Sequence, residues 1–107
     1  EESVTNSWRL ISSENGELEA PNSGNQQTAS LVADIDKDGD HDFFIAERTA
    51  FPALTLYRHQ SGQWIKHIVE AGLLRIEAGS TTLDIDKDGD LDIVFGGDAQ
   101  SNEVRWW

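Results

Sequence analysis

The sequence of 107 residues contains no cysteine, so no disulfide supports the fold, and the redox compartment stays undecided. Basic residues are few: eight stand against 20 acidic residues, for a net charge of −12. No basic patch is present to attract nucleic acid or an anionic membrane. No apolar run reaches the length of about 18 residues that a membrane span needs. The length fits one domain.

The acidic residues are concentrated in two copies of one motif. The first copy, Asp34 to Asp42, reads DIDKDGDHD, and the second, Asp84 to Asp92, reads DIDKDGDLD at an offset of 50 residues. Each copy holds five aspartates within nine residues. Like charges this dense repel one another unless a cation neutralises them. Carboxylates at alternate positions suit Ca²⁺, which takes about six to eight oxygen ligands, better than Mg²⁺. We therefore predict two Ca²⁺ ions per chain.

The predicted ligands are all ten aspartates of the two loops. The first, third and fifth residues of each loop offer side-chain oxygens, and the glycine that follows allows a sharp turn at little cost. The seventh residue is expected to turn its backbone carbonyl inward, and the ninth closes the site. The complete set is Asp34, Asp36, Asp38, Asp40, Asp42, Asp84, Asp86, Asp88, Asp90 and Asp92. The alternative is an acidic, solvated turn without metal.

The residues after the loops favour strands over helices. An EF-hand places a glutamate at position 12 of its loop, but Ile45 and Phe95 occupy this position here. Both loops run into apolar stretches, so we expect each ion at a turn between two strands. Alternating and apolar segments bounded by glycine, proline and polar residues predict short strands throughout. The expected strands are 8–12, 29–33, 43–46, 54–58, 64–69, 80–83, 93–95 and 103–107.

The remaining segments are expected to be connections. Residues 13–28 are polar and contain Gly16, Pro21 and Gly24, which predicts a long loop. Residues 60–63 are expected to form a hairpin turn. No strong amphipathic helix is visible, and the only helical alternative is one short turn within residues 69–78.

A period of about 50 residues with four strands per unit is typical of a β-propeller blade. The two Asp-x-Asp-x-Asp-Gly-x-x-Asp loops, each followed by an apolar strand (Phe95-Gly96-Gly97 after the second), resemble FG-GAP repeats. These are the calcium-bearing blades of integrin-type and VCBS-type propellers. The resemblance covers residues 29–107, and it implies that the first two strands of each blade flank the ion. That family builds closed rings of more blades on one chain, whereas this chain encodes about two.

We therefore predict an all-β fold of β-propeller blades, each with four antiparallel strands, about two blades per chain, completed into a ring by oligomerisation. Residues 1–28 supply an N-terminal strand and loop, residues 29–70 the first blade, and residues 71–107 a second blade that lacks its outer strand. Strand 8–12 resembles strand 64–68, so we expect it to complete a blade of a neighbouring copy. A trimer would close about six blades and a tetramer about eight. The alternative is a fragment of a longer propeller.

Strands that alternate in direction place both acidic loops and the turn at 60–63 at one end of the fold, and the other loops at the opposite end. Ligand binding tends to reside on such varied loops. The candidate ligand residues there are Arg48, Phe51, Arg75, Glu77, Asp98 and Gln100. A solvated rim is the alternative. The four tryptophans are expected to pack between blades rather than to form a platform for sugars.

The expected function is that of a calcium-stabilised binding module, with a carbohydrate or protein ligand on the loop face opposite the calcium loops. We expect no binding of nucleic acid, and a secreted, extracellular or periplasmic location, although the first residues are not a signal peptide. No catalytic constellation is visible, so the module is not expected to be an enzyme. The alternatives are the propeller portion of a polysaccharide-acting enzyme and a purely structural assembly element.

Overall fold

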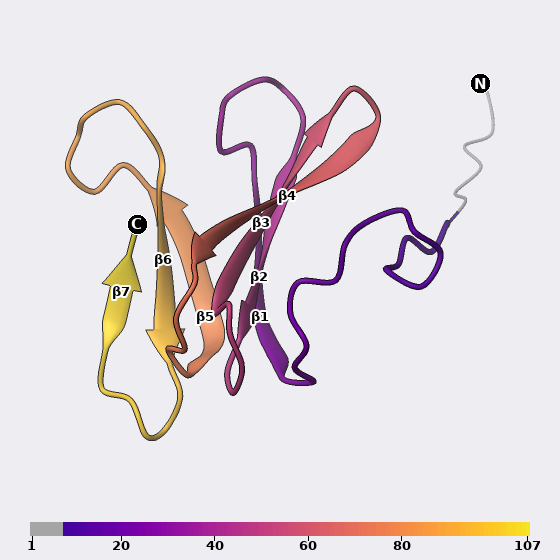
Figure 1. The fold of residues 1–107 in the computed structure, drawn as a ribbon. Helices are drawn as coiled ribbons and strands as arrows, with labels where there is room; N and C mark the ends of the chain where they lie inside the picture. The colour runs from indigo at the N-terminus through magenta and orange to yellow at the C-terminus, as the bar shows by residue number, and fades with distance from the viewer. Residues whose placement is uncertain (1–7) are drawn as a thin grey trace, which may run out of the picture.

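The computed structural model describes residues 8–107, which form seven strands in two antiparallel sheets (Figure 1). The predicted all-β class is confirmed. No helix that could cross a membrane occurs among these residues. The four-stranded sheet has the order β1-β2-β3-β4, and the three-stranded sheet the order β5-β6-β7. The strands are β1 (Gln27–Ala33), β2 (Asp42–Glu47), β3 (Leu54–Gln60), β4 (Gln63–Glu70), β5 (Ile76–Leu83), β6 (Asp92–Gly97) and β7 (Val104–Trp106).

Most predicted strands are present with small changes of their bounds, but residues 69–78 differ. They were expected to form mainly a connection, with one helical turn as the alternative, and the helical alternative is wrong. β5 begins at Ile76, which pairs with Gly97, and the regular register resumes at Ser80 opposite Phe95. The residues between them form an irregularity with positive φ at Ala78 and Gly79. The predicted hairpin turn at 60–63 is confirmed, since Gln60 pairs with Gln63 around Ser61 and Gly62.

The two sheets pack face to face through one hydrophobic core. β1 lies beside β5, where the Thr28 hydroxyl donates to the Ile76 carbonyl at 2.7 Å and the Ser80 hydroxyl to the Ser30 carbonyl at 2.8 Å. Period-2 alternation places apolar side chains of β2 and β6 on this side. The buried cluster draws on both sheets and comprises Ala29, Phe44, Ala46, Ala53, Leu54, Ile76, Ile93 and Phe95, with Leu31, Leu56 and Trp107 packed against it.

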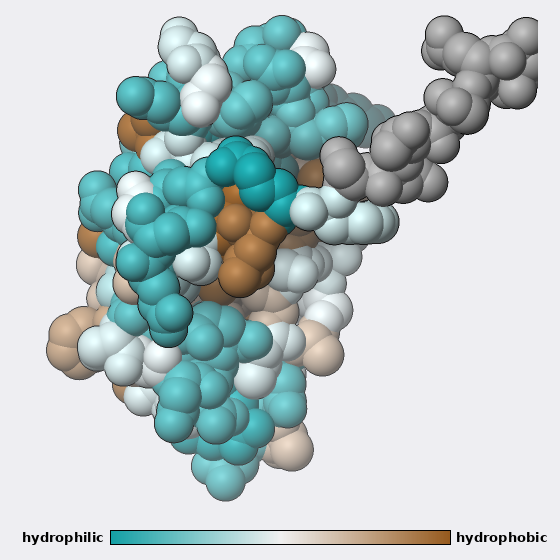
Figure 2. All heavy atoms as spheres, turned by 90° about the vertical axis from the view of Figure 1, so that its right-hand side faces the viewer, coloured by the Kyte–Doolittle hydropathy of each residue, from teal (hydrophilic) through white to brown (hydrophobic). Residues whose placement is uncertain are grey.

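The segment from Trp8 to Gln26 runs over the outer face of the four-stranded sheet. The hydroxyl of Tyr57 donates to the carbonyl of Glu19, and the Lys66 ammonium donates to the carbonyl of Ala20 at 2.8 Å. Figure 2 shows this side of the molecule, where an apolar area is bordered by hydrophilic residues.

The strand predicted at residues 8–12 is not formed within the single chain, and its expected pairing with a neighbouring copy stays a prediction. These residues have no strand conformation, and Trp8 and Leu10 are 97% and 80% exposed. A strand needs a partner edge for its N–H and C=O groups, and none lies beside this segment. Residues 1–7 of the predicted N-terminal unit lie outside the described residues.

The expected packing of tryptophans between the two units is confirmed for Trp107, which packs against the core shared by both sheets and donates its indole N–H to Glu70 on β4 at 3.3 Å. Trp64 instead packs edge-on against Phe43 on the outer face of the four-stranded sheet, with centroids 5.0 Å apart. Trp8 and Trp106 are exposed.

The connections gather at two ends, as predicted (Figure 1). The two acidic loops, which follow β1 and β5, and the β3–β4 turn lie at one end. The β2–β3, β4–β5 and β6–β7 connections lie at the other. Antiparallel pairing of consecutive strands requires this separation.

Candidate metal centres

The two acidic loops have the same backbone conformation. Lys37 and Lys87, the fourth residues, both have φ of 61°. Gly39 and Gly89, the sixth residues, have φ of 94° and 96°, a region that glycine enters at little cost. The identical turn in two places follows from the identical sequence DIDKDGD at the start of each loop.

Side-chain carboxylates fold each loop around its first residue. In the first loop, Asp34 accepts hydrogen bonds from the backbone N–H groups of Asp38 and Gly39 at 3.0 and 2.8 Å. Asp38 in turn accepts one from the N–H of Asp40 at 2.9 Å. The second loop repeats all three bonds, with distances of 3.1, 2.9 and 2.9 Å. Short acidic side chains thus satisfy turn N–H groups that strands cannot pair.

The last aspartate of each loop ties the loop to the sheet. Asp42 accepts from the N–H of Ile35 at 3.2 Å, and Asp92 accepts from the N–H of Ile85 at 2.9 Å. Both aspartates are buried at the first position of a strand. Asp42 also accepts from the N–H of His59 on β3 at 3.0 Å.

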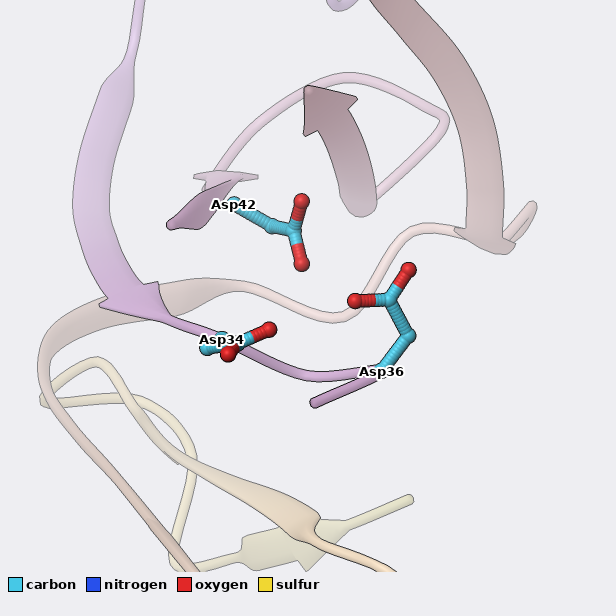
Figure 3. A group of neighbouring side chains, drawn as sticks. All are labelled: Asp34, Asp36 and Asp42. Carbon is cyan, nitrogen blue, oxygen red and sulfur yellow. The ribbon is translucent and has the colours of Figure 1, made fainter. Parts of the chain in front are cut away.

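Two groups of carboxylates come together as a result. Oxygens of Asp34, Asp36 and Asp42 all lie within 4.8 Å of one another, and Figure 3 shows the three side chains directed toward a common space. In the second loop the group comprises Asp84, Asp86 and Asp88. The other predicted ligands, Asp38, Asp40, Asp90 and Asp92, lie outside these two groups.

These donor sets fit a calcium ion. Every donor is a hard oxygen, and Ca²⁺ completes its coordination with carbonyls and water in flexible geometry. The predicted contribution of Asp40 and Asp90 is a backbone carbonyl, so the positions of their side chains do not bear on it.

Residues 34–95 match the sequence model of the FG-GAP-like repeat family. The chain belongs to this family. The match begins at the first aspartate of the first loop and ends in β6, after the second loop. Comparisons with curated proteins and with solved structures give no match.

Sequence reasoning missed one difference between the two loops of this FG-GAP-like chain. Arg58 on β3 forms an ion pair with Asp36, donating from Nε at 3.1 Å and from a terminal nitrogen at a shorter distance. Its hydrogen bond lowers the pKa of the Asp36 carboxyl. In the second loop, desolvation and the charges of Asp88 and Asp92 raise the pKa of Asp86.

The first loop contains one further perturbed carboxyl. A hydrogen bond from the Asp40 N–H lowers the pKa of Asp38, but desolvation and the charges of Asp36 and Asp34 together raise it. The crowding of carboxylates therefore remains costly here without a cation, even with Arg58 in place.

Four of the predicted ligand residues gather at the opposite end of the fold, where they pair with one another. Asp98, whose side chain is 2% exposed, meets Arg75 at 2.7 Å and Arg48 at 3.3 Å. Arg48 also meets Glu77 at 3.3 Å. The hydrogen bond from Arg75 lowers the pKa of Asp98. The cluster links the first sheet's β2–β3 connection to the second sheet, and its part in ligand binding stays a prediction.

The other two predicted ligand residues, Phe51 and Gln100, are exposed, and the N–H of Gln100 donates to Asp98 at 2.9 Å. An open groove of about 340 Å³ lies near the cluster, and its lining includes Leu73, Arg75 and Asn102.

Proposed function

We propose that this FG-GAP-like chain is a calcium-stabilised module of the β-propeller type, with one Ca²⁺ in each acidic loop. The observation that carries the proposal is the repetition of one carboxylate-lined turn, with the same hydrogen bonds, at the same end of both sheets. A bound Ca²⁺ would supply positive charge where carboxylates crowd. The chain's own contribution is to fix each loop through Asp34 or Asp84 and to anchor it through Asp42 or Asp92.

The ions are proposed to be structural. Calcium sites of extracellular modules have dissociation constants on the order of 10⁻⁴–10⁻³ M, which suits a secreted or periplasmic protein. A ligand that binds only the folded state stabilises it by about 2.7 kcal/mol when its concentration is about 100 times its dissociation constant.

Calcium-dependent unfolding tests the proposal. We expect the Tm to rise with Ca²⁺ and to fall with a chelator, because only the folded chain brings the carboxylates together. Asp34→Asn and Asp84→Asn should each remove about half of the calcium-dependent rise. Glu103→Gln removes an acidic charge from the exposed β6–β7 connection and serves as the matched control. Equal shifts with Mg²⁺, or with NaCl at the same ionic strength, would contradict the proposal.

A second proposal concerns self-association. The first sheet uses the face with Phe44 and Leu56 to cover the second sheet. The residues 50 positions later, Val94 and Trp106, form the corresponding face of the second sheet, where Trp106 is 50% exposed. Exposed apolar area of this kind is typical of interaction surfaces. We propose that another copy of the chain packs its first sheet there, as a step toward a closed trimeric or tetrameric ring.

The groove beside Leu73 and Asn102 and the exposed Phe51 favour a ligand on the loop face. We propose a carbohydrate or a protein as its class. A glycan array with wild type and Phe51→Ala tests the carbohydrate. Measuring whether the same glycans are cleaved tests the alternative of an enzyme portion.

A further inference from the structure

We infer that Arg58 is a built-in counter-ion of the first acidic loop and weakens calcium binding there. This inference rests on the proposed function, because it concerns the affinity of one of the two proposed sites.

The position of Arg58 is fixed by the sheet. Its backbone pairs with Ile65 on β4, and its neighbour His59 donates an N–H to Asp42, the last residue of the first loop. β3 therefore holds both Arg58 and an anchor of the loop. The guanidinium donates two N–H groups to Oδ2 of Asp36, while Oδ1 of the same carboxylate accepts from the N–H of Asp38 at 3.3 Å.

Partial burial strengthens this contact. The side chains of Arg58 and Asp36 are 28% and 24% exposed. A guanidinium that gives two bonds to a carboxylate is oriented more strongly than an exposed lysine would be.

The second loop has no such contact. It repeats the bonds of the first loop, including that from the Asp88 N–H to Asp86 at 3.2 Å. Within residues 8–107, no arginine or lysine forms an ion pair with one of its carboxylates. Lys37 of the first loop donates to the carbonyl of Gly89, so a cation also lies at the second loop, without an ion pair to one of its carboxylates. Among the described residues, a cation in contact with a proposed ligand is seen at the first loop.

Two effects of Arg58 act in the same direction. It relieves carboxylate repulsion in the calcium-free loop, which reduces what calcium can gain there. It also repels the incoming ion. A unit charge roughly 6 Å from a divalent ion weakens binding on the order of tenfold in a water-like dielectric, and salt reduces this to severalfold. We expect the first site to bind Ca²⁺ roughly three- to tenfold more weakly with Arg58 than without it.

Isothermal titration of single-site variants with Ca²⁺ tests this difference. Asp84→Asn leaves the first site and Asp34→Asn leaves the second. Adding Arg58→Gln should tighten binding severalfold in the Asp84→Asn background and leave the Asp34→Asn background unchanged. Arg58→Lys, which keeps the charge, should bind nearly as weakly as the chain with Arg58.

Lys66→Gln is the matched control. It removes one positive charge from the same sheet, where the ammonium contacts the carbonyl of Ala20 and no loop residue. It should leave both affinities within about twofold, since its charge is distant and screened. Circular dichroism checks that each variant is folded.

The outcomes separate the two proposals. Absence of calcium binding by the wild-type chain overturns the proposed function. Unchanged or weaker binding at the first site after Arg58→Gln overturns the inference and leaves the proposed function standing.

Discussion

At the scale of single residues, the buried carboxylate of Glu47 is paired by hydrogen bonds from two neighbouring segments of the chain. The carboxylate of Glu47 has no exposed surface, yet it accepts hydrogen bonds from the N–H groups of Gln26 and Thr49 and from the Thr49 hydroxyl, at 3.0–3.2 Å. Burying a carboxylate lowers the stability of the fold little while its hydrogen bonds are made, and much more when they are lost. Glu47 therefore fixes both the start of β1 and the β2–β3 connection.

Gly24 makes room for this carboxylate, which leads to a prediction. In Gly24→Ala the added Cβ would lie 2.7 Å from Glu47 Cδ and Oε1, closer than any real contact. The carboxylate must move and lose bonds, so we expect a loss of about 1–3 kcal/mol in the free energy of unfolding. Urea denaturation measures it.

Gly72→Ala is the control for this substitution, because its Cβ would meet only Glu70 Oε2 at 3.4 Å. It should change stability by less than about 0.5 kcal/mol. Equal losses of stability in the two variants would contradict the close packing of the Glu47 carboxylate against Gly24.

Asp98 supports a prediction about pH. Its pKa is lowered in the folded state, mainly by the hydrogen bond from Arg75. A lowered pKa means that the stabilisation is present above the ordinary carboxyl pKa near 3.8 and is lost as the pH falls through the lower, folded-state value. Asp98→Asn should therefore lower the urea midpoint at pH 7, and the difference from wild type should shrink below about pH 4. The exposed pair of Glu103 and Arg105 is the comparison, and Glu103→Gln should have little effect at either pH. A difference that stays constant with pH would contradict this role.

At the scale of elements, the sequence predicts those turns and strands that neighbouring residues determine. The DIDKDGD turns, the hairpin around Ser61 and Gly62, and the strands after each loop follow from glycine, aspartate and period-2 patterns. The bounds of β5 do not, because Ile76 pairs with Gly97 across an irregularity that only the partner strand defines.

Contacts between residues far apart in the sequence were not predicted, because they depend on how the strands are placed relative to one another. The pattern Trp8 to Ser12 is that of a strand, yet a pattern alone supplies no edge to pair with. The contact of Arg58 with Asp36 joins residues 22 positions apart through strand register. The ligand residues Arg48, Arg75 and Asp98 were expected from their charges on loops, and their mutual pairing could not be inferred without the positions of three connections.

At the scale of the whole molecule, two packed sheets leave two outer faces. One face of the four-stranded sheet is partly covered by the segment before β1, through bonds such as that from Thr55 to the Pro21 carbonyl at 3.3 Å. The outer face of the three-stranded sheet carries the exposed side chains of Leu83, Val104 and Trp106. Repeat architectures bury such faces by stacking a further repeat. The four-stranded sheet of a second copy can cover this face, provided that the segment before β1 moves off that sheet.

Light scattering in Ca²⁺ and then in a chelator tests this association. We expect a mass of three or four chains with calcium and a smaller mass without it, because the loops lie at the edges of the stacking sheets. Trp106→Glu should reduce the mass by placing a charge in the interface, whereas Phe51→Glu, at a 68% exposed position in the β2–β3 connection, should not. Trp8→Glu should also reduce the mass if residues 8–12 pair with a neighbouring copy, as predicted. A calcium-insensitive monomer in wild type would instead mean that other blades cover these faces, and the self-association proposal would be wrong.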